Sequence, residues 1–166
     1  LVATSYLWKA GFDAVIVNPF AGFKDGVGPV IEDAHKRGKG VICLVYMSHR
    51  GAAEGYGLKT IRSGSRQPTS MYMLFAERAL KWKADGVVVG ATHLKILASV
   101  AKTLKNKVWI FSPGVGAQGG SARSASKSGA DFLIVGRSIL DSPVPRAAAE
   151  EIRRESWRPF LDGSLD

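Results

Sequence analysis

The chain has 166 residues, of which 46% are hydrophobic and 22% charged, a composition typical of a globular protein with a sizeable core. No apolar run approaches the roughly 20 residues that a membrane-spanning helix needs, and the first residues lack the pattern of a secretory signal. The single cysteine, Cys43, excludes an internal disulfide and a multi-cysteine metal site. We therefore expect a reducing, cytoplasmic setting with no membrane partner and no bound metal.

The charge balance is strongly basic, with 23 Lys and Arg against 14 Asp and Glu, a net charge of +9. A charge of this size raises the possibility of a nucleic-acid partner. The basic residues are scattered, however, and most fall in or just after the last turn of a predicted helix, where a cation meets the helix dipole favourably. We interpret them as a solvated surface and expect no nucleic-acid partner.

Apolar runs and helical spacings alternate along the chain. Helical spacing or helix boundaries are found at residues 2–10, 25–37, 71–83, 94–104, 122–128 and 145–155. Short apolar runs of the kind found in buried parallel strands occupy residues 14–20, 41–47, 85–90, 108–111 and 132–135. Residues 58–67 are polar and basic without a clear period, so we expect a loop or a weak helix there.

Three of the strands are entered through similar sequences, Gly11-Phe12-Asp13, Lys83-Ala84-Asp85 and Gly129-Ala130-Asp131. In each, a helix ends, the chain turns, and an aspartate precedes an apolar run. This β/α repeat predicts a parallel sheet with right-handed crossovers. Five such units are fewer than a closed eight-stranded barrel requires, so we expect one partial barrel domain over residues 1–156 and a tail over 157–166. An open five-stranded sheet is the structural alternative.

Two glycine-containing turns follow predicted strands. The first is Ser112-Pro113-Gly114-Val115-Gly116-Ala117-Gln118-Gly119-Gly120, and the second is Gly136-Arg137-Ser138. Glycines leave backbone N–H groups accessible to an anion, and the planar guanidinium of Arg137 suits a phosphate. In barrels of alternating strands and helices, ligands bind at this end of the strands. The two turns therefore predict a phosphate site.

Together with Met47-Ser48-His49, these turns closely resemble the orotidine 5′-phosphate decarboxylase family, in its archaeal-type branch. The similarity runs from Lys9 to about Ile152. The resemblance implies an α/β fold of the (β/α)8 TIM-barrel family, with this chain covering about five units, strands four to eight. It also implies a homodimer in the full-length protein and conversion of orotidine 5′-monophosphate to UMP and CO₂ without a cofactor.

The resemblance further implies roles for individual residues. Gly136 and Arg137 would hold the phosphate, and Gln118 would close over the phosphate and the pyrimidine. Ser48 would hydrogen-bond the pyrimidine edge, and Pro113 would pack near the base. Three residues on separate strands would form an apolar wall against the departing carboxylate: Ile16, Leu44 and Ile134.

The chain also departs from the family pattern. The family's Asp-x-Lys-x-x-Asp motif, whose lysine donates the proton, does not occur in these 166 residues. Tyr46 stands where an acidic residue is usual, Arg50 where proline is usual, and His93-Leu94 where Thr-Arg-Pro is frequent. We therefore expect no catalytic residue in this chain and no activity from it alone, because nothing here would protonate the carbanion.

Two other functions remain open from the residues. A related phosphosugar enzyme of the same suprafamily, such as a hexulose-phosphate synthase, would share the phosphate site, although Gln118 argues against it. A non-enzymatic basic binding module is the other alternative, and its affinity for nucleic acid would fall steeply with salt.

Overall fold

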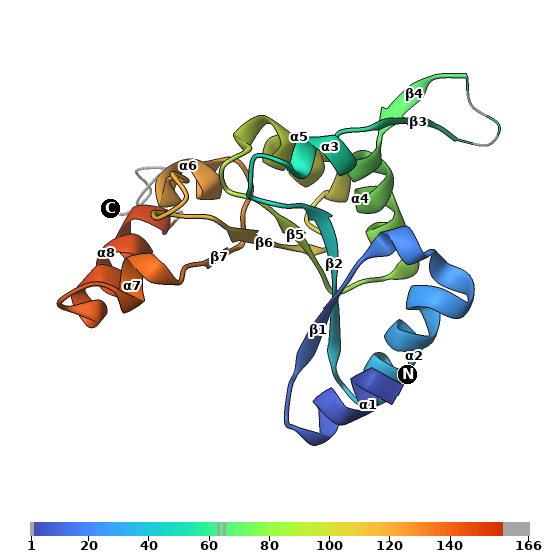
Figure 1. The fold of residues 1–166 in the computed structure, drawn as a ribbon, viewed down its shortest axis with the longest axis horizontal. Helices are drawn as coiled ribbons and strands as arrows, with labels where there is room; N and C mark the ends of the chain where they lie inside the picture. The colour runs from blue at the N-terminus through green and yellow to red at the C-terminus, as the bar shows by residue number, and fades with distance from the viewer. Residues whose placement is uncertain (1, 63, 65, 158–166) are drawn as a thin grey trace.

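Five parallel strands form the central sheet of the computed structural model, which describes residues 2–62, 64 and 66–157 (Figure 1). The strand order is β1-β2-β5-β6-β7, and every neighbouring pair is parallel. The strands are β1 Ala14–Val17, β2 Gly40–Tyr46, β5 Gly86–Val89, β6 Trp109–Pro113 and β7 Phe132–Ile134. The predicted β/α repeat and parallel sheet are therefore confirmed.

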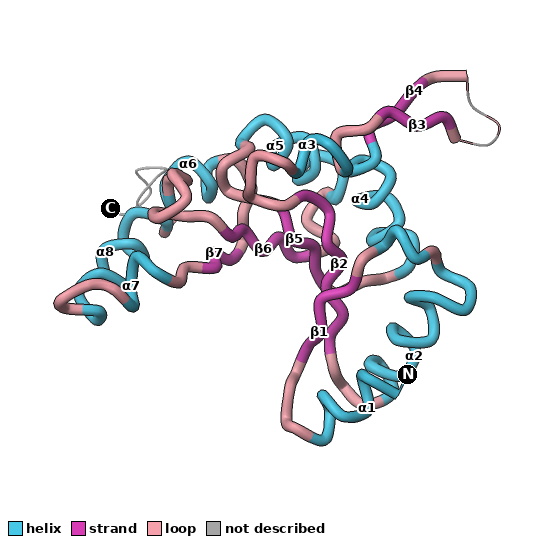
Figure 2. Tube along the Cα trace, viewed as in Figure 1, coloured by secondary structure: helices cyan, strands magenta, loops and turns pink. Residues whose placement is uncertain are grey.

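Helices connect the successive strands, as the colouring of Figure 2 shows. The longer ones are α1 Val2–Lys9, α2 Gly28–Lys36, α4 Met71–Trp82, α5 Leu94–Leu104, α6 Ala122–Lys127 and α8 Pro145–Ser156. Shorter turns are the 3₁₀ helix Pro19–Ala21, the π-type turn Phe23–Val27, α3 Ala52–Gly55 and α7 Arg137–Leu140. Ser121 caps α6, because its Oγ accepts from the Ser124 amide at 3.2 Å.

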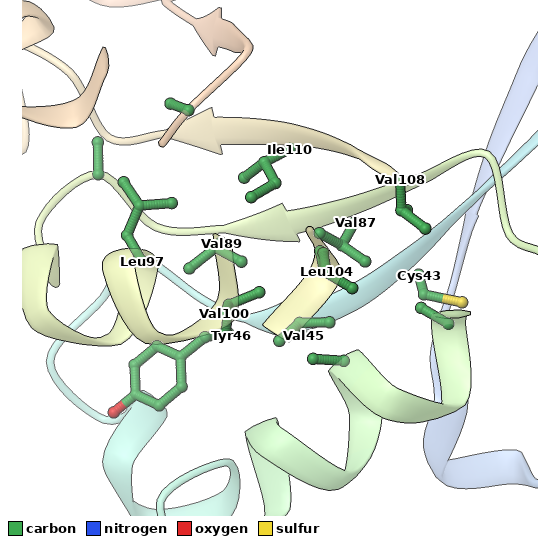
Figure 3. Close-up of a cluster of buried hydrophobic side chains, with 14 of the residues drawn as sticks. Cys43, Val45, Tyr46, Val87, Val89, Leu97, Val100, Leu104, Val108 and Ile110 are labelled. Atoms are coloured by element: carbon green, nitrogen blue, oxygen red, sulfur yellow. The ribbon is translucent and has the colours of Figure 1, made fainter. Parts of the chain in front are cut away.

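One face of the sheet is fully covered by helices. Cys43, Val45, Val87 and Val89 are each 0% exposed. Figure 3 shows the apolar side chains of α5 packed against these strands. Burial of one such side chain stabilises the fold by about 1.5–3 kcal/mol, so this layer holds the strands, and hence the loops at their ends, in place.

The opposite face of the sheet is largely uncovered by the described residues. The rings of Phe111 and Phe132 stack there with centroids 4.9 Å apart, and Trp109 remains 58% exposed. Gly86 lies beneath this stack, and a Cβ on Gly86 would come within 2.6 Å of the Phe111 ring. This apolar face is typical of the inward-facing surface of a barrel.

The repeated aspartates have a structural function at the strand entrances. An Asp85 carboxylate oxygen accepts from the Val41 amide at 2.7 Å, and an Asp131 oxygen accepts from the Ile110 amide at 2.9 Å. In each case the aspartate before one strand binds the backbone of its neighbour. Asp13 instead pairs with Lys39 at 2.7 Å.

Several predicted boundaries were wrong. The first strand ends at Val17, because Asn18 accepts from the Phe20 amide and begins a 3₁₀ turn. The helix expected over 25–37 begins only at Gly28, since Asp25 has φ 59°. The segment expected as a loop or weak helix contains an antiparallel hairpin, β3 Lys59–Ile61 with β4 Pro68–Ser70. The hairpin projects from the body of the molecule in Figure 1. Of the expected tail, only Trp157 lies within the described residues, and Arg153 stands over its ring.

Candidate phosphate and pyrimidine site

The loop after β6 is closed by its own backbone hydrogen bonds. The Gly120 amide donates to the Gly114 carbonyl at 3.0 Å, and the Gly116 amide donates to the Gly120 carbonyl at 2.8 Å. A tighter turn forms at its tip, where the Gly119 amide donates to the Gly116 carbonyl at 2.7 Å. Gly114, Gly116 and Gly119 all have positive φ values, which favour glycine. The glycines of the turn predicted from the sequence therefore define one compact loop.

Gly114 brings the loop against the end of β2. A Cβ on Gly114 would lie 2.8 Å from Ser48 Cβ, 3.4 Å from Ser48 Oγ and 3.1 Å from Gln118 Oε1. The side chains of Ser48 and Gln118 thus both lie close to the position where Gly114 lacks a side chain. Thr92 steadies Ser48, because its hydroxyl donates to the Ser48 carbonyl at 2.8 Å. A hydroxyl and a carboxamide together can satisfy the donor and acceptor edge of a pyrimidine.

The second turn contacts the first. Gly136 precedes the short helix α7, and the Ile139 and Leu140 amides both donate to its carbonyl. Ser138 Oγ accepts from the Ala117 amide at 2.9 Å, and it also lies directly against Gly116. Ala117, the residue before Gln118, is therefore hydrogen-bonded to Ser138, the residue after Arg137. Sequence reasoning missed this contact, because nothing in the sequence indicates which hydroxyl the loop amide would meet.

The cation of the second turn is available to a ligand. The Arg137 side chain is exposed, and none of the salt bridges between described residues involves it. Gln118 is also exposed. An unneutralised guanidinium beside a glycine loop is suited to binding an anion.

The remaining predicted residues are Pro113 and the three residues of the expected apolar wall. Pro113 is the last residue of β6 and lies in register with Ile134 of β7. Ile16, Leu44 and Ile134 are on the less covered face, as alternation along the strands requires. Ile16 and Ile134, however, lie on the two outer strands of the sheet. The wall that these three side chains would form therefore stays a prediction.

Aromatic groups that the sequence did not single out surround the base of the Ser48 loop. Tyr46 is 3% exposed, and its ring contacts those of Tyr56, Tyr72 and His93. Burial raises the pKa of the Tyr46 hydroxyl above its ordinary value. His49 directs Nε2 to the Met47 sulfur at 3.1 Å, which agrees with a packing role. Tyr46, the departure noted in the sequence, is thus a packing residue.

No preformed chamber encloses these loops among the cavities observed. A cleft of about 710 Å³ lies elsewhere, between β7 and α8, and is lined by residues such as Trp109, Phe132, Ile152 and Trp157. It contains none of the predicted site residues. Across residues 2–157, omitting 63 and 65, no cluster of three metal-ligating side chains occurs. Within the same residues, no helix is long and apolar enough to span a membrane.

Comparison with known proteins shows a family match over most of the chain. Residues 1–152 match the family model described as "Orotidine 5'-phosphate decarboxylase / HUMPS family". The chain is 40% identical over 149 residues to orotidine 5′-phosphate decarboxylase of Methanosarcina mazei, covering 90% of this chain and 62% of that protein. It therefore spans about three-fifths of that relative's length.

Solved structures show the same fold. Orotidine 5′-phosphate decarboxylase from Pyrococcus horikoshii superposes with a TM-score of 0.73 at 34% identity, covering 93% of this chain and 66% of that one. The enzyme from Methanocaldococcus jannaschii, solved with the inhibitor BMP, gives a TM-score of 0.71 at 29% identity, covering 86% of this chain and 61% of that one. The present fold is thus a partial (β/α) barrel, as the sequence predicted.

Proposed function

Because the chain belongs to the orotidine 5′-phosphate decarboxylase / HUMPS family, we propose that it supplies the phosphate- and pyrimidine-binding part of an orotidine 5′-phosphate decarboxylase. The reaction breaks the bond between C6 of orotidine 5′-monophosphate and its carboxylate, releasing CO₂, and a proton then adds to C6 to give UMP. The observation that carries the proposal is the 2.9 Å hydrogen bond from the Ala117 amide to Ser138 Oγ. It joins the loop of Gln118 to the loop of Arg137.

The phosphate is assigned to the second loop. Arg137 offers a planar set of donors and a full positive charge, and the Gly136 backbone can approach the anion without a side chain in the way. Pyrimidine recognition is assigned to Ser48 and Gln118, whose side chains both lie close to Gly114. Pro113, at the end of β6, lies at the base of the same loop.

Phosphate binding would contribute to the chemistry at a distance. The phosphate does not react, so its binding energy can be used to hold Gln118 closed over the reacting ring. Closure also removes water, which strengthens the electrostatic interactions inside the site. Loop closure is therefore the step that this chain would control.

The proton donor lies outside this sequence. Since the family's Asp-x-Lys-x-x-Asp motif does not occur in the 166 residues, the acid that protonates C6 would come from other polypeptide. Ile16, Leu44 and Ile134 would complete an apolar wall only with that polypeptide in place. We propose that the chain alone binds UMP but releases no CO₂ from orotidine 5′-monophosphate.

The proposal extends to a cytoplasmic homodimer for the complete protein. Sedimentation of the complete protein tests the dimer.

Titration calorimetry with UMP, uridine and a hexulose 6-phosphate tests the assignment. UMP should bind, uridine should bind more weakly, and Arg137→Ala should weaken UMP binding at least about tenfold, because a hydrogen bond to a charged group contributes roughly 1.5–3 kcal/mol. Arg154→Ala, an exposed arginine on α8, is the matched control and should have no effect.

Three outcomes would contradict the proposal. Equal affinity for UMP and uridine would mean that this chain has no phosphate site. Tighter binding of the sugar phosphate than of UMP would favour the phosphosugar alternative. Binding of nucleic acid that Arg137→Ala leaves unchanged would favour the basic module instead.

A further inference from the structure

We propose that Ser138 is a positioning residue that fastens the two ligand-binding loops into one unit before any ligand arrives. The inference rests on the proposed function, because the unit it describes is the phosphate and pyrimidine site. It assigns a role to a residue that neither the motifs nor the chemistry of the reaction singles out.

The position of the bond gives Ser138 this role. Ser138 Oγ accepts from the Ala117 amide at 2.9 Å. Ala117 immediately precedes Gln118, and Ser138 immediately follows Arg137. One hydrogen bond thus fixes the spacing between the carboxamide for the pyrimidine and the guanidinium for the phosphate. Among the hydrogen bonds of the described residues, it is the one that links these two loops directly.

The packing around the bond supports the same role. Gly116 lies so close to Ser138 that a Cβ on it would collide with Ser138 Oγ. Gly116 also has φ +71°, and its carbonyl accepts from the Gly119 amide. The tip of the first loop is therefore shaped to fit the Ser138 hydroxyl. A loop held in this way has less conformational freedom to lose when a ligand binds.

The hydrogen bond between Ala117 and Ser138 lies at the surface, where its loss affects the loop rather than the core. Ala117, Gln118 and Arg137 are all exposed, and Ser138 is half-buried. A single neutral hydrogen bond contributes modestly to stability, so its loss should leave the sheet intact. Its effect should appear as local opening of the loop.

Hydrogen exchange of the ligand-free chain is the first test. Ser138→Ala should speed exchange of the Ala117 amide by about three- to tenfold, which is the range expected for one hydrogen bond. Exchange of core amides such as Val87 should not change. Ser142→Ala is the matched control, because Ser142 Oγ also accepts a backbone N–H, from Val144 at 3.2 Å, but at the far end of α7. It should leave Ala117 unchanged.

Nucleotide affinity is the second test. Ser138→Ala should weaken UMP binding by a similar three- to tenfold, and it should affect uridine less, because uridine does not engage the Arg137 side of the unit. A purely structural serine would change both affinities equally, or would change the unfolding free energy.

The two tests separate this inference from the proposed function. Unchanged Ala117 exchange in Ser138→Ala would overturn the role of Ser138, whatever UMP does. Faster exchange in a chain that does not bind UMP would keep the link between the loops and overturn the proposed function. Faster exchange with an unchanged UMP affinity would show that the link does not position the site, and would also overturn the inference.

Discussion

At the scale of single residues, the candidate site depends on a glycine that has no space for a larger side chain. Gly114 is buried, has φ +96°, and lies close to the side chains of both Ser48 and Gln118. The sequence indicated a phosphate loop from its glycines and Arg137. It could not indicate that Ala117 and Ser138 would form the contact, because that depends on how far each strand extends beyond the sheet.

Replacement of Gly114 by alanine should lower both the affinity for UMP and the unfolding free energy by more than backbone strain alone explains. The added Cβ would meet Ser48 at 2.8 Å, so we expect weaker UMP binding and a loss of about 1–3 kcal/mol in unfolding free energy. Gly11→Ala is the control, since Gly11 has a similar φ of +88° and nothing within 4 Å of its Cβ position. Chemical denaturation of both variants measures the difference. An equal loss in the two would show that contact with Ser48 does not matter.

Cys43 should be inert in the folded chain. Burial raises the pKa of its thiol to about 12, and the thiolate is the reactive form. Iodoacetamide at about pH 8 should therefore leave Cys43 unmodified until urea unfolds the protein, as intact mass would show. Rapid alkylation without denaturant would mean that the core between β2 and its covering helices opens readily.

At the scale of elements, the sequence predicted helices and parallel strands well but their details less well. The helix Leu94–Leu104 was predicted with its correct ends. The hairpin of β3 and β4 was missed, since three-residue strands show no period. The antiparallel pairing comes from contacts that only the folded chain makes.

The strand-entry aspartates should stabilise the sheet through their neighbours. Asp85→Ala removes the acceptor of the Val41 amide, and an unsatisfied buried donor costs about 1–3 kcal/mol. Asp85→Asn keeps an acceptor oxygen and should recover most of the loss. Urea unfolding of both variants measures this. Equal losses would assign the effect to the charge of Asp85 and its contact with His35 rather than to the backbone bond.

Acid should weaken the ion pair between Asp13 and Lys39 at the start of β1. The hydrogen bond from Lys39 holds the pKa of Asp13 below its ordinary value. A lowered pKa means that the folded state favours the ionised form, so its contribution is present above the ordinary pKa and is lost as pH falls through the folded pKa. Below about pH 4, wild-type stability should therefore fall more than that of Asp13→Asn. Parallel acid profiles would contradict this.

At the scale of the whole molecule, five strands place both loops at one rim but leave one face of the sheet largely uncovered. The sequence predicted this incompleteness from the number of β/α units, and the share of its relatives that the chain spans agrees. The wall of Ile16, Leu44 and Ile134 could not be tested by the chain alone, because Ile16 and Ile134 lie on the two outer strands of the sheet. Under the proposed function, binding and catalysis are separable, since the proposed binding loops are in this chain and the family's Asp-x-Lys-x-x-Asp motif is not.

Amide chemical shifts during a UMP titration test the central claim most directly. We predict that Ala117, Gln118, Arg137 and Ser138 shift together with one common dissociation constant, because the two loops form a single site. Shifts confined to one loop, or gathered instead around the cleft between β7 and α8, would contradict it.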